Sequence, residues 1–311
     1  MLKISLEGLQ VLDAIDRRGS IAGAATELHR VPSTISYAVA KFEQDLGVSV
    51  FERAGPRISL TPAGRELLKE GRYLLRAAQE LEHRVRRVAT GWETQFAIGL
   101  ESLLAPSALA DDLRDFYQIA DSTRLRLSQE VMSGMWEALL DRRVDLLIAA
   151  AGEGPSGGGY IAEPMGSLPF VFAVAPGHPL ARAVEPLGKA ELRAHRAVAV
   201  GDSALRLVQR TVGLIFGQDT LTVPDIFSKY AFQVAGFGFG YLPELYARPA
   251  IDAGFLIQKQ VEETRPDENF YLAWRPDEAG AALAWWLQRL RRPGCLLKLF
   301  ERTAKAHFQL R

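Results

Sequence analysis

Residues 19–51, GSIAGAATELHRVPSTISYAVAKFEQDLGVSVF, constrain the fold of this chain more than any other stretch. Ser20 is a typical N-cap residue, and the small side chains of Ala24 and Ala25 that follow form a face on which another helix can pack closely. Pro32 suits the first position of a second helix. Apolar residues then recur at helical spacing: Ile35, Val39, Phe42 and Leu46. The stretch predicts two short helices joined by a turn.

The opposite side of the second helix is polar, with hydroxyl groups and one ammonium group on Ser33, Thr34, Ser36, Tyr37 and Lys41. Such groups reach base edges or phosphates when a helix lies in the major groove of DNA. The alternative is an ordinary solvated helix surface. An alanine-rich helix, a short turn and a polar second helix together are typical of a helix-turn-helix. Residues 48–60 add a candidate wing, in which Arg53 and Arg57 flank a Gly-Pro turn.

Two further helices complete this region. Residues 6–16 predict a first helix capped by Ser5, and Thr61-Pro62 begins a helix that meets no breaker before Gly91. Along the long helix, spacings of four and three relate Leu67, Gly71, Leu74, Ala78, Leu81, Val85 and Val88. This heptad seam, interrupted at Gly71, spans roughly 42 Å and favours pairing with a second copy of the chain. The alternative is an amphipathic helix that lies on its own domain.

From Thr94 onward the pattern alternates between strands and helices. Strands are predicted at 94–100, 124–131, 144–150, 170–175, 197–200, 221–223, 239–242 and 270–274. Helices are predicted at 106–118, 134–143, 225–235 and 279–290, the last closing the chain. This alternation favours a largely parallel, doubly wound sheet. At 311 residues the chain is long enough for two or more domains.

Composition excludes several classes of protein. Lys plus Arg and Asp plus Glu both total 37, so net charge alone does not indicate a nucleic-acid partner. No apolar run is long enough for a membrane helix and the N-terminus lacks a signal peptide, so we expect a cytoplasmic protein without membrane contact. The histidines show no metal-ligand spacing, and the single cysteine, Cys295, has no histidine near it in the sequence. We expect no cofactor, no metal and no enzymatic activity.

The first 65 residues resemble the DNA-binding domain of LysR-type transcriptional regulators. The family's motifs stand here as Ser20, Ala24-Ala25, Ser36, Phe42-Glu43, Leu46-Gly47, Phe51-Glu52-Arg53 and Leu60-Thr61-Pro62-Ala63-Gly64. The resemblance implies base contacts from Pro32, Ser33, Thr34 and Tyr37, and phosphate or minor-groove contacts from Ser36, Lys41, Arg53 and Arg57. Tyr37 stands where arginine is common in the family, so the operator sequence does not follow from the resemblance.

The second half resembles the effector-binding region of the same family, which has a two-lobed periplasmic-binding-protein-like fold. Supporting motifs in family order are Ala138-Leu139-Leu140, Val144-Asp145-Leu146, Gly177-His178-Pro179-Leu180-Ala181 and residues 234–243. We therefore expect an α+β multidomain chain: a winged helix-turn-helix at 1–60, a long linker and dimerisation helix at 61–91, and an α/β effector domain at 92–311. Lobe 1 would take about 92–161 and 266–311, and lobe 2 about 162–265.

In such a fold, ligands bind between the lobes at strand ends and helix N-termini. The expected effector-binding residues are Glu101, Ser102, Met132, Ser133, Trp136, Asp202, Ser203, Phe227 and Ser228. The alternative for Ser102, Ser133 and the neighbouring Asp225 is helix capping alone. Trp136 and Phe227 would stack on a ring, whereas Glu101 would repel a carboxylate. The expected effector is a small molecule, aromatic or a small organic acid, that is uncharged or weakly acidic.

These features predict a homodimeric or homotetrameric regulator that binds double-stranded DNA under the control of a small-molecule effector. Effector binding would favour one closure state of the lobes and thereby change how the paired DNA-binding domains meet the operator. The rival is a cytoplasmic small-molecule binding protein or enzyme whose N-terminal helices serve only dimerisation. The polar face of the second helix argues against that rival.

Overall fold

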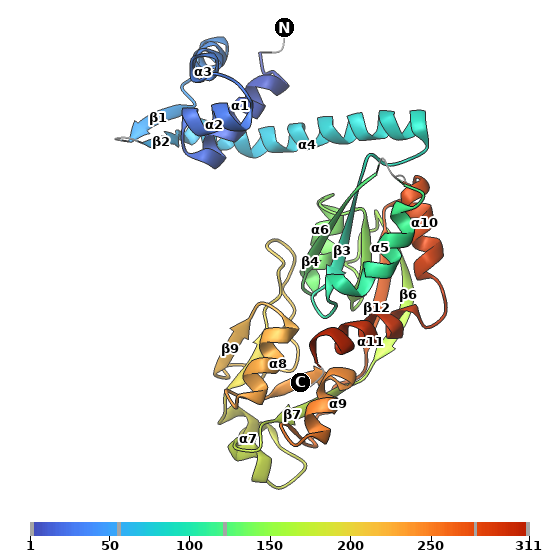
Figure 1. Cartoon of the computed structure of the whole chain (residues 1–311). Helices are drawn as coiled ribbons and strands as arrows, with labels where there is room; N and C mark the ends of the chain where they lie inside the picture. Colours follow the sequence, from blue (N-terminus) through green and yellow to red (C-terminus); the bar gives the residue numbers. More distant parts are fainter. Residues whose placement is uncertain (1–2, 55–56, 121–122, 277–278, 309–311) are drawn as a thin grey trace. The chain divides into compact units, whose positions relative to one another are not determined.

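The computed structural model describes residues 3–54, 57–120, 123–276 and 279–308, and the chain divides into two compact units, residues 1–89 and 90–311 (Figure 1). The N-terminal unit contains α1 (Leu6–Arg18), α2 (Ile21–Glu27), α3 (Pro32–Leu46), β1 (Phe51–Ala54), β2 (Arg57–Leu60) and α4 (Pro62–Thr90). The strands β1 and β2 pair antiparallel, as the wing of a winged helix-turn-helix requires.

Local sequence signals set the helix boundaries in this unit. The Ser5 hydroxyl accepts a hydrogen bond from the Gly8 N–H at 3.1 Å, and the Ser20 hydroxyl accepts one from the Gly23 N–H at 3.0 Å. Both serines therefore act as N-caps, as the sequence predicted. Pro32 occupies the first position of α3, where its missing N–H leaves no hydrogen bond unmade.

Alanines bring the first three helices close together. Ala24 and Ala25 of α2 are buried against Val11 and Ile15 of α1 and Ile35 of α3. A second cluster joins the wing and α4 to the same core through Leu9, Leu12, Phe42, Val50 and Leu68. Because α3 is anchored through the stripe that contains Ile35 and Phe42, its opposite face is free of the core.

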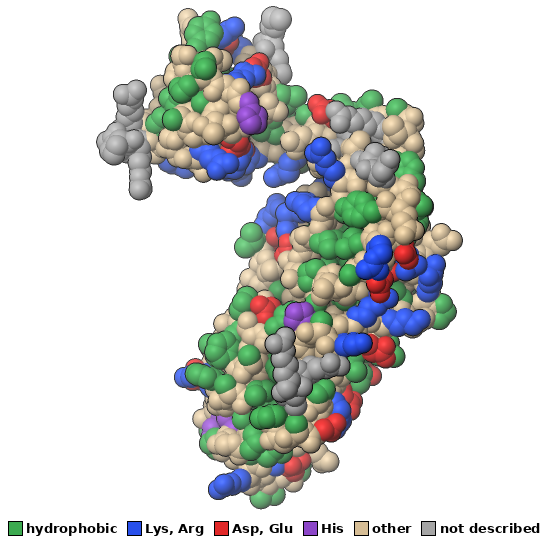
Figure 2. Space-filling model, viewed as in Figure 1, with side chains coloured by type: hydrophobic (Ala, Val, Ile, Leu, Met, Phe, Trp, Pro, Cys, Tyr) green, Lys and Arg blue, Asp and Glu red, His purple; other side chains and the backbone are tan. Residues whose placement is uncertain are grey.

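The long helix α4 divides its apolar seam between two environments. Near its start, Leu67 packs into the N-terminal core, and the missing side chain of Gly71 leaves room for Leu9. Farther along, the seam residues are exposed: Leu81 by 55%, Val85 by 61% and Val88 by 86%. Figure 1 shows α4 extending beyond the other elements of its unit, and Figure 2 shows hydrophobic side chains on the surface of this extension.

The second unit begins with a five-stranded sheet, lobe 1. Its elements are β3 (Gln95–Glu101), η1 (Pro106–Leu109), α5 (Ala110–Tyr117), β4 (Arg124–Glu130), α6 (Ser133–Leu140), β5 (Leu146–Ala151), β6 (Ile161–Leu168), β12 (Glu268–Trp274), α10 (Ala281–Leu290) and α11 (Cys295–His307). The strand order is β4-β3-β5-β12-β6. The helix α6 packs on one face of this sheet, and α5, α10 and α11 pack on the other.

Lobe 2 lies between β6 and β12 in the sequence. It contains β7 (Phe170–Val174), η2 (Pro179–Arg182), α7 (Lys189–Arg193), β8 (Ala197–Val200), β9 (Thr220–Val223), α8 (Ile226–Val234), β10 (Gly240–Pro243), α9 (Glu244–Asp252) and β11 (Ile257–Gln258). The strands β10, β7 and β11 form an antiparallel sheet, and β8 pairs parallel with β9. The strands β6 and β12 connect the two lobes.

The expectation of a largely parallel sheet was wrong for much of this unit. Only the β4-β3-β5 part of the lobe 1 sheet is parallel among the described strands, because there each connection crosses back through a helix. The strand β12 pairs antiparallel with both β5 and β6. The chain enters β12 from lobe 2, at the edge of the sheet where β3, β4 and β5 end. The strand β12 therefore runs in the opposite direction to these three strands.

Several elements were absent from the sequence-based assignment. The strand β6 contains Pro164 and Gly166, which disfavour regular strand structure, and its pairing with β12 shifts register at this point. The strand nevertheless forms because β12 supplies a long partner. The expected closing helix at 279–290 is followed by α11, so α10 does not close the chain. Since β6 extends the lobe 1 sheet to Leu168, the chain leaves lobe 1 later than residue 161.

Candidate functional site

The exposed face of α3 is the first candidate site. The side chains of Pro32, Ser33, Thr34, Ser36 and Lys41 are exposed, and Tyr37 is 69% exposed. The Ser36 hydroxyl donates to the Pro32 carbonyl oxygen at 3.0 Å. Beside this face, Tyr37 and Lys41 line a shallow groove with Lys3, Ala40, Gln44 and Asp45. The surface offers hydroxyl groups, a phenol and two ammonium groups to a partner.

Acidic side chains engage several of the described arginines elsewhere in this unit. Glu27 binds Arg17 and Arg18, each at 2.6 Å, and Arg72 binds Asp13 at 2.7 Å. Lys41 has no acidic partner within 4 Å in the described part of the unit. Its charge is therefore available to an external anion. The backbone of Arg53 and Arg57 lies in the β1–β2 hairpin, but their side chains lie outside the described residues.

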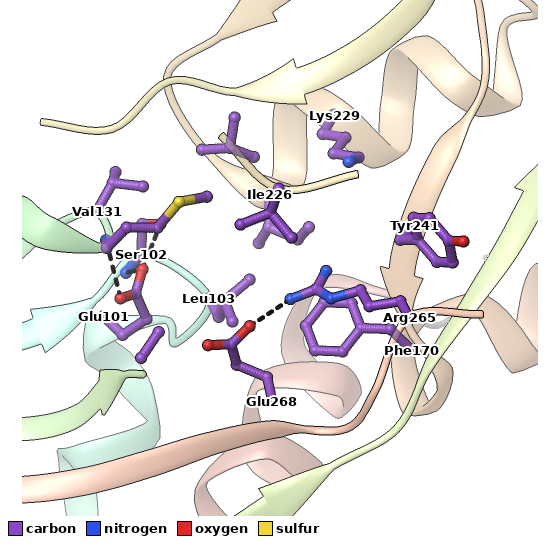
Figure 3. A pocket seen from close by; sticks show the side chains of 14 residues that line it. Glu101, Ser102, Leu103, Val131, Phe170, Ile226, Lys229, Tyr241, Arg265 and Glu268 are labelled. Carbon is purple, nitrogen blue, oxygen red and sulfur yellow. Dashed lines mark hydrogen bonds and ion pairs between the residues drawn. The ribbon is translucent and has the colours of Figure 1, made fainter. Parts of the chain in front are cut away.

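The second candidate site is a cavity between the two lobes (Figure 3). It encloses about 540 Å³ of space free of protein atoms, including its opening to solvent. Lobe 1 contributes residues at the ends of β3, β4 and β5, whereas lobe 2 contributes residues from β7, β8, α8 and β10. The lining residues are Glu101, Ser102, Leu103, Val131, Met132, Ala151, Phe170, Val200, Val212, Ile226, Lys229, Tyr241, Arg265 and Glu268.

Glu101 occupies the lobe 1 wall and is 1% exposed. Its Oε1 accepts hydrogen bonds from the Ser102 N–H at 3.0 Å and the Ser102 hydroxyl at 3.1 Å, and its Oε2 accepts one from the Met132 N–H at 3.1 Å. Burial nevertheless raises the pKa of Glu101 to about 7, because it penalises the charged form more than the three donors favour it. The carboxyl group can therefore exchange a proton near neutral pH.

The other end of the cavity is basic. The Arg265 guanidinium lies 3.7 Å from the centre of the Phe170 ring and donates to Glu268 at 2.6 Å. Glu268 also accepts from Arg210 at 2.9 Å. Lys229 of α8 is 8% exposed, and burial, with a smaller effect from Arg265, lowers its pKa to about 7. Figure 3 shows Arg265 bound to Glu268, with Lys229 on the lobe 2 wall.

Three of the nine predicted effector residues line this cavity: Glu101, Ser102 and Met132. Trp136 and Phe227 do not, which corrects the expectation that they stack on a ligand. Trp136, a residue of α6, is 2% exposed, with its ring centre 5.2 Å from that of Tyr160. Phe227 packs on Phe308 at 5.5 Å, because α8 turns Ile226 and Lys229 toward the cavity instead.

The other predicted positions serve the contact between lobes or cap helices. Asp202 accepts hydrogen bonds from the N–H groups of Ser133 and Gly134, each at 3.1 Å. The Ser203 hydroxyl donates to Glu130 at 2.7 Å, while the Ser228 N–H donates to the cap residue Asp225 at 2.7 Å. None of Ser133, Asp202, Ser203 and Ser228 lines the cavity. The side chains of Ser133, Asp202 and Ser203 are hydrogen-bonded within the protein.

Sequence reasoning missed the basic end, although a signal for Lys229 was present. In α8 the positions Ile226, Lys229 and Gln233 recur at helical spacing, and all three are buried. A lysine on the buried stripe of a short helix indicates a functional group. Arg265 lies in the connection that returns to lobe 1, and Glu268 begins β12 two residues before the strand predicted at 270–274.

A segment of lobe 2, residues 201–212, crosses to lobe 1 beside the cavity; we call it the strap. The Glu137 Oε2 of α6 accepts hydrogen bonds from the N–H groups of Leu205 at 3.0 Å, Arg206 at 2.7 Å and Leu207 at 2.9 Å. Arg210 donates to the carbonyl oxygen of Ala151 at 2.8 Å. These bonds join the lobes through one loop next to the cavity.

The described residues contain neither a membrane-spanning helix nor a metal-binding cluster. No helix there has the length and apolar character needed to cross a membrane. Within the same ranges, no group of three or more His, Cys, Asp or Glu side chains is placed to hold a metal ion.

Known families match both units. Residues 6–65 match the bacterial regulatory helix-turn-helix protein, lysR family, and residues 89–293 match the LysR substrate binding domain. The chain is 37% identical over 285 residues to the uncharacterized HTH-type transcriptional regulator YeeY of Escherichia coli (strain K12), which covers 92% of each protein. It is 36% identical over 282 residues to the HTH-type transcriptional regulator PunR of the same strain, which covers 91% of each.

Solved structures share the fold. The probable transcriptional regulator PA0477 from Pseudomonas aeruginosa superimposes with a TM-score of 0.58 at 22% identity, covering 93% of this chain and 97% of that one. Full-length CbnR, crystallised with its target DNA, superimposes with a TM-score of 0.58 at 20% identity, covering 93% and 100%. The names of these proteins do not support the enzyme alternative. This chain, with its helix-turn-helix and effector-binding domain, belongs to the LysR family of transcriptional regulators.

Proposed function

We propose that this regulator binds double-stranded DNA through α3 and the β1–β2 hairpin, and that a small organic molecule in the cavity between the lobes controls it. The observation that carries the proposal is the exposure of one continuous polar face on α3, whose opposite face is anchored in the core by Ile35 and Phe42. The fold is shared with CbnR, whose structure contains its target DNA. Such a regulator acts in the cytoplasm.

The proposed contacts on DNA divide by chemistry. Pro32, Ser33, Thr34 and Tyr37 stand near the start of α3, the end of a recognition helix that reads base edges. Ser36, in the same part of the helix, and Lys41, farther along, contact the phosphate backbone or the minor groove, as do Arg53 and Arg57 of the wing. Lys41 suits a phosphate because no acidic side chain in the described part of the chain engages it.

The proposed active assembly is a homodimer or homotetramer. The exposed seam residues Leu81, Val85 and Val88 support it, because an apolar stripe on a long helix is stabilised when a second helix covers it. Pairing presents two recognition helices to one operator, with half-sites about 34 Å apart or a multiple of that distance.

The proposed coupling between ligand and DNA runs through lobe closure. The strap bonds to lobe 1 through Glu137, and Val212 at its end lines the cavity. A ligand that touches both walls would bind the closed state more tightly than an open one and thus shift the population. The expected effector residues Glu101, Ser102 and Met132 stay in this proposal because they line the cavity.

The test measures DNA binding at several salt concentrations, using a fragment from upstream of the chain's own gene and a scrambled fragment of equal length. Lys41→Ala should weaken binding to both fragments by a similar factor and reduce the salt slope by about one, because one phosphate contact is lost. Tyr37→Ala should instead reduce the preference for the upstream fragment. Lys298→Ala, an exposed lysine on α11, is the matched control.

Each outcome has a separate meaning. An unchanged salt slope for Lys41→Ala would contradict the phosphate contact. If the wild-type protein binds neither fragment in a salt-dependent manner, and a genome-wide binding map shows no enriched sites, DNA regulation itself is rejected.

A further inference from the structure

Lys229 is a buried cation without a partner. Its side chain is 8% exposed and lines the cavity, and within the described residues no hydrogen bond or ion pair joins its Nζ to the protein. The first residue of β10 makes room for it: a Cβ added at Gly240 would lie 3.0 Å from the Lys229 Nζ. The ammonium group therefore occupies a place from which water is largely excluded and where no protein anion balances its charge.

Its neighbours increase the positive charge. The Arg265 side chain acts on Lys229 as a like charge, and it is fixed by the Phe170 ring and by Glu268. Glu268 is shared, because Arg210 also binds it at 2.9 Å. Two guanidinium groups thus share the Glu268 carboxylate, and that carboxylate forms no ion pair with Lys229. Burying a charge without a counter-charge is costly, so an anion placed here would be strongly stabilised.

The remaining wall limits what else the anion can carry. Apolar side chains line the rest of the cavity: Leu103, Val131, Val200, Val212 and Ile226. At the far end, Glu101 is held by its three donors and already feels the charge of Glu268. A second carboxylate on the ligand would meet Glu101 at this end, whereas an apolar body would contact the apolar wall.

We propose that the cavity takes a small organic monoanion, with its carboxylate seated at Lys229 beside Arg265 and its uncharged body against the apolar wall. This inference rests on the proposed function, in which the same cavity is the effector site. It narrows the sequence-based expectation of an aromatic compound or small organic acid, uncharged or weakly acidic, to a monocarboxylate. Glu101 opposes a carboxylate only at its own end of the cavity, and Lys229 stands at the other.

The protonation of Lys229 supplies a second readout. Since the pKa of Lys229 lies at about 7, its amine is mostly neutral above that pH when the cavity is empty. A bound carboxylate favours the charged form, so binding at about pH 8.5 should take up a proton. The groups that face the amine or share its cavity, and that contribute to the balance, are Arg265, Glu268, Tyr241 and Glu101.

The experiment uses the full-length protein without DNA and a panel of probes matched in size. Benzoate and hexanoate are the monoanions, benzamide and hexanamide their neutral counterparts, and adipate the dianion. Calorimetry gives the affinity of each for the wild type, Lys229→Met, Lys229→Arg and the control Lys298→Met, which changes an exposed lysine outside the cavity. Titrations at about pH 8.5 in two buffers of different ionisation enthalpy give the number of protons taken up.

The monoanions should bind the wild type roughly tenfold or more tightly than the amides or adipate, with proton uptake. Lys229→Met should lose that preference and the proton uptake, Lys229→Arg should keep the preference, and Lys298→Met should behave as the wild type. Lys229→Met is expected to fold, since methionine matches the buried stem of lysine.

Three results would overturn the inference: amides that bind as tightly as acids, monoanions that bind Lys229→Met as they bind the wild type, or no monoanion binding at all. None of these results bears on DNA binding, which the salt-dependent assay measures separately. The proposed function and the ligand class can therefore fail independently.

Discussion

Glu101 illustrates at the level of one residue how burial and hydrogen bonding act against each other. Three donors from Ser102 and Met132 surround its oxygens, yet burial raises its pKa to about 7. The pattern of a strand followed by Glu-Ser correctly placed this residue at the cavity. The sequence could not show that burial and the charge of Glu268 would raise the pKa of this carboxyl group.

The first prediction concerns the pH dependence of stability. The pKa of Glu101 rises from an unfolded value near 4.5 to about 7 in the folded state, so the folded state binds more protons between these values. The stability that this group contributes is complete below pH 4.5 and is lost as the pH rises toward 7. Relative to Glu101→Gln, the wild type should lose up to about 3 kcal/mol of unfolding free energy across this window.

Tryptophan fluorescence during urea unfolding reports on the second structural unit, which contains Glu101, because every tryptophan lies beyond residue 91. Glu301→Gln removes an exposed carboxyl on α11 and controls for the loss of one charge. A wild-type-minus-variant difference that stays flat between pH 4.5 and 7 would show that Glu101 does not titrate there.

At the level of elements, α4 serves two tasks along one helix. Leu67 and Gly71 meet the core of their own unit, whereas the seam from Leu81 to Val88 is exposed. The heptad spacing predicted the whole stripe, but it could not show where the helix would leave its own core. That point depends on how far α1 and the wing reach along α4.

The second prediction is that Leu81→Glu combined with Val85→Glu converts the assembly into monomers. Carboxylates in the seam would be buried opposite each other, which costs more than the apolar contact provides. Light scattering after size-exclusion chromatography measures the mass directly. Arg76→Glu, which lies about two and a half turns before Val85 and therefore on the opposite face of the helix, should leave the mass unchanged. A wild-type chain that is already monomeric would reject the role given to the seam.

At the level of the whole second unit, two lobes meet around one cavity, and the strap joins them. Glu137 accepts hydrogen bonds from three backbone N–H groups of the strap. In the other direction, Asp202 of the strap accepts hydrogen bonds from the N–H groups of Ser133 and Gly134 at the start of α6. Sequence reasoning identified Asp202 and Ser133 as neighbours of the cleft. The structure shows that they bind each other, which ties the lobes together.

The third prediction is that Glu137→Ala loosens the strap. Three N–H groups would lose their acceptor, so amide exchange at residues 205–207 should become roughly tenfold faster or more. Asp141→Ala, one turn farther along α6, removes only the surface ion pair with Arg206 and should change exchange little. Hydrogen exchange followed by mass spectrometry compares the two. Equal protection of the strap in both variants would contradict this role for Glu137.

The sequence alone determined the helices of the N-terminal unit, because their signals are local: Ser5 and Ser20 as caps, Pro32 at a helix start, and alanines where helices approach closely. In the second unit the sequence predicted many strands and helices. It did not predict the direction of β12, the strand β6 or the burial of Trp136 away from the cavity. Those features depend on partners more than a hundred residues away. The cavity's charges, Lys229, Arg265 and Glu268, come together only when the chain returns from lobe 2, so tertiary structure alone decided the chemistry of the site.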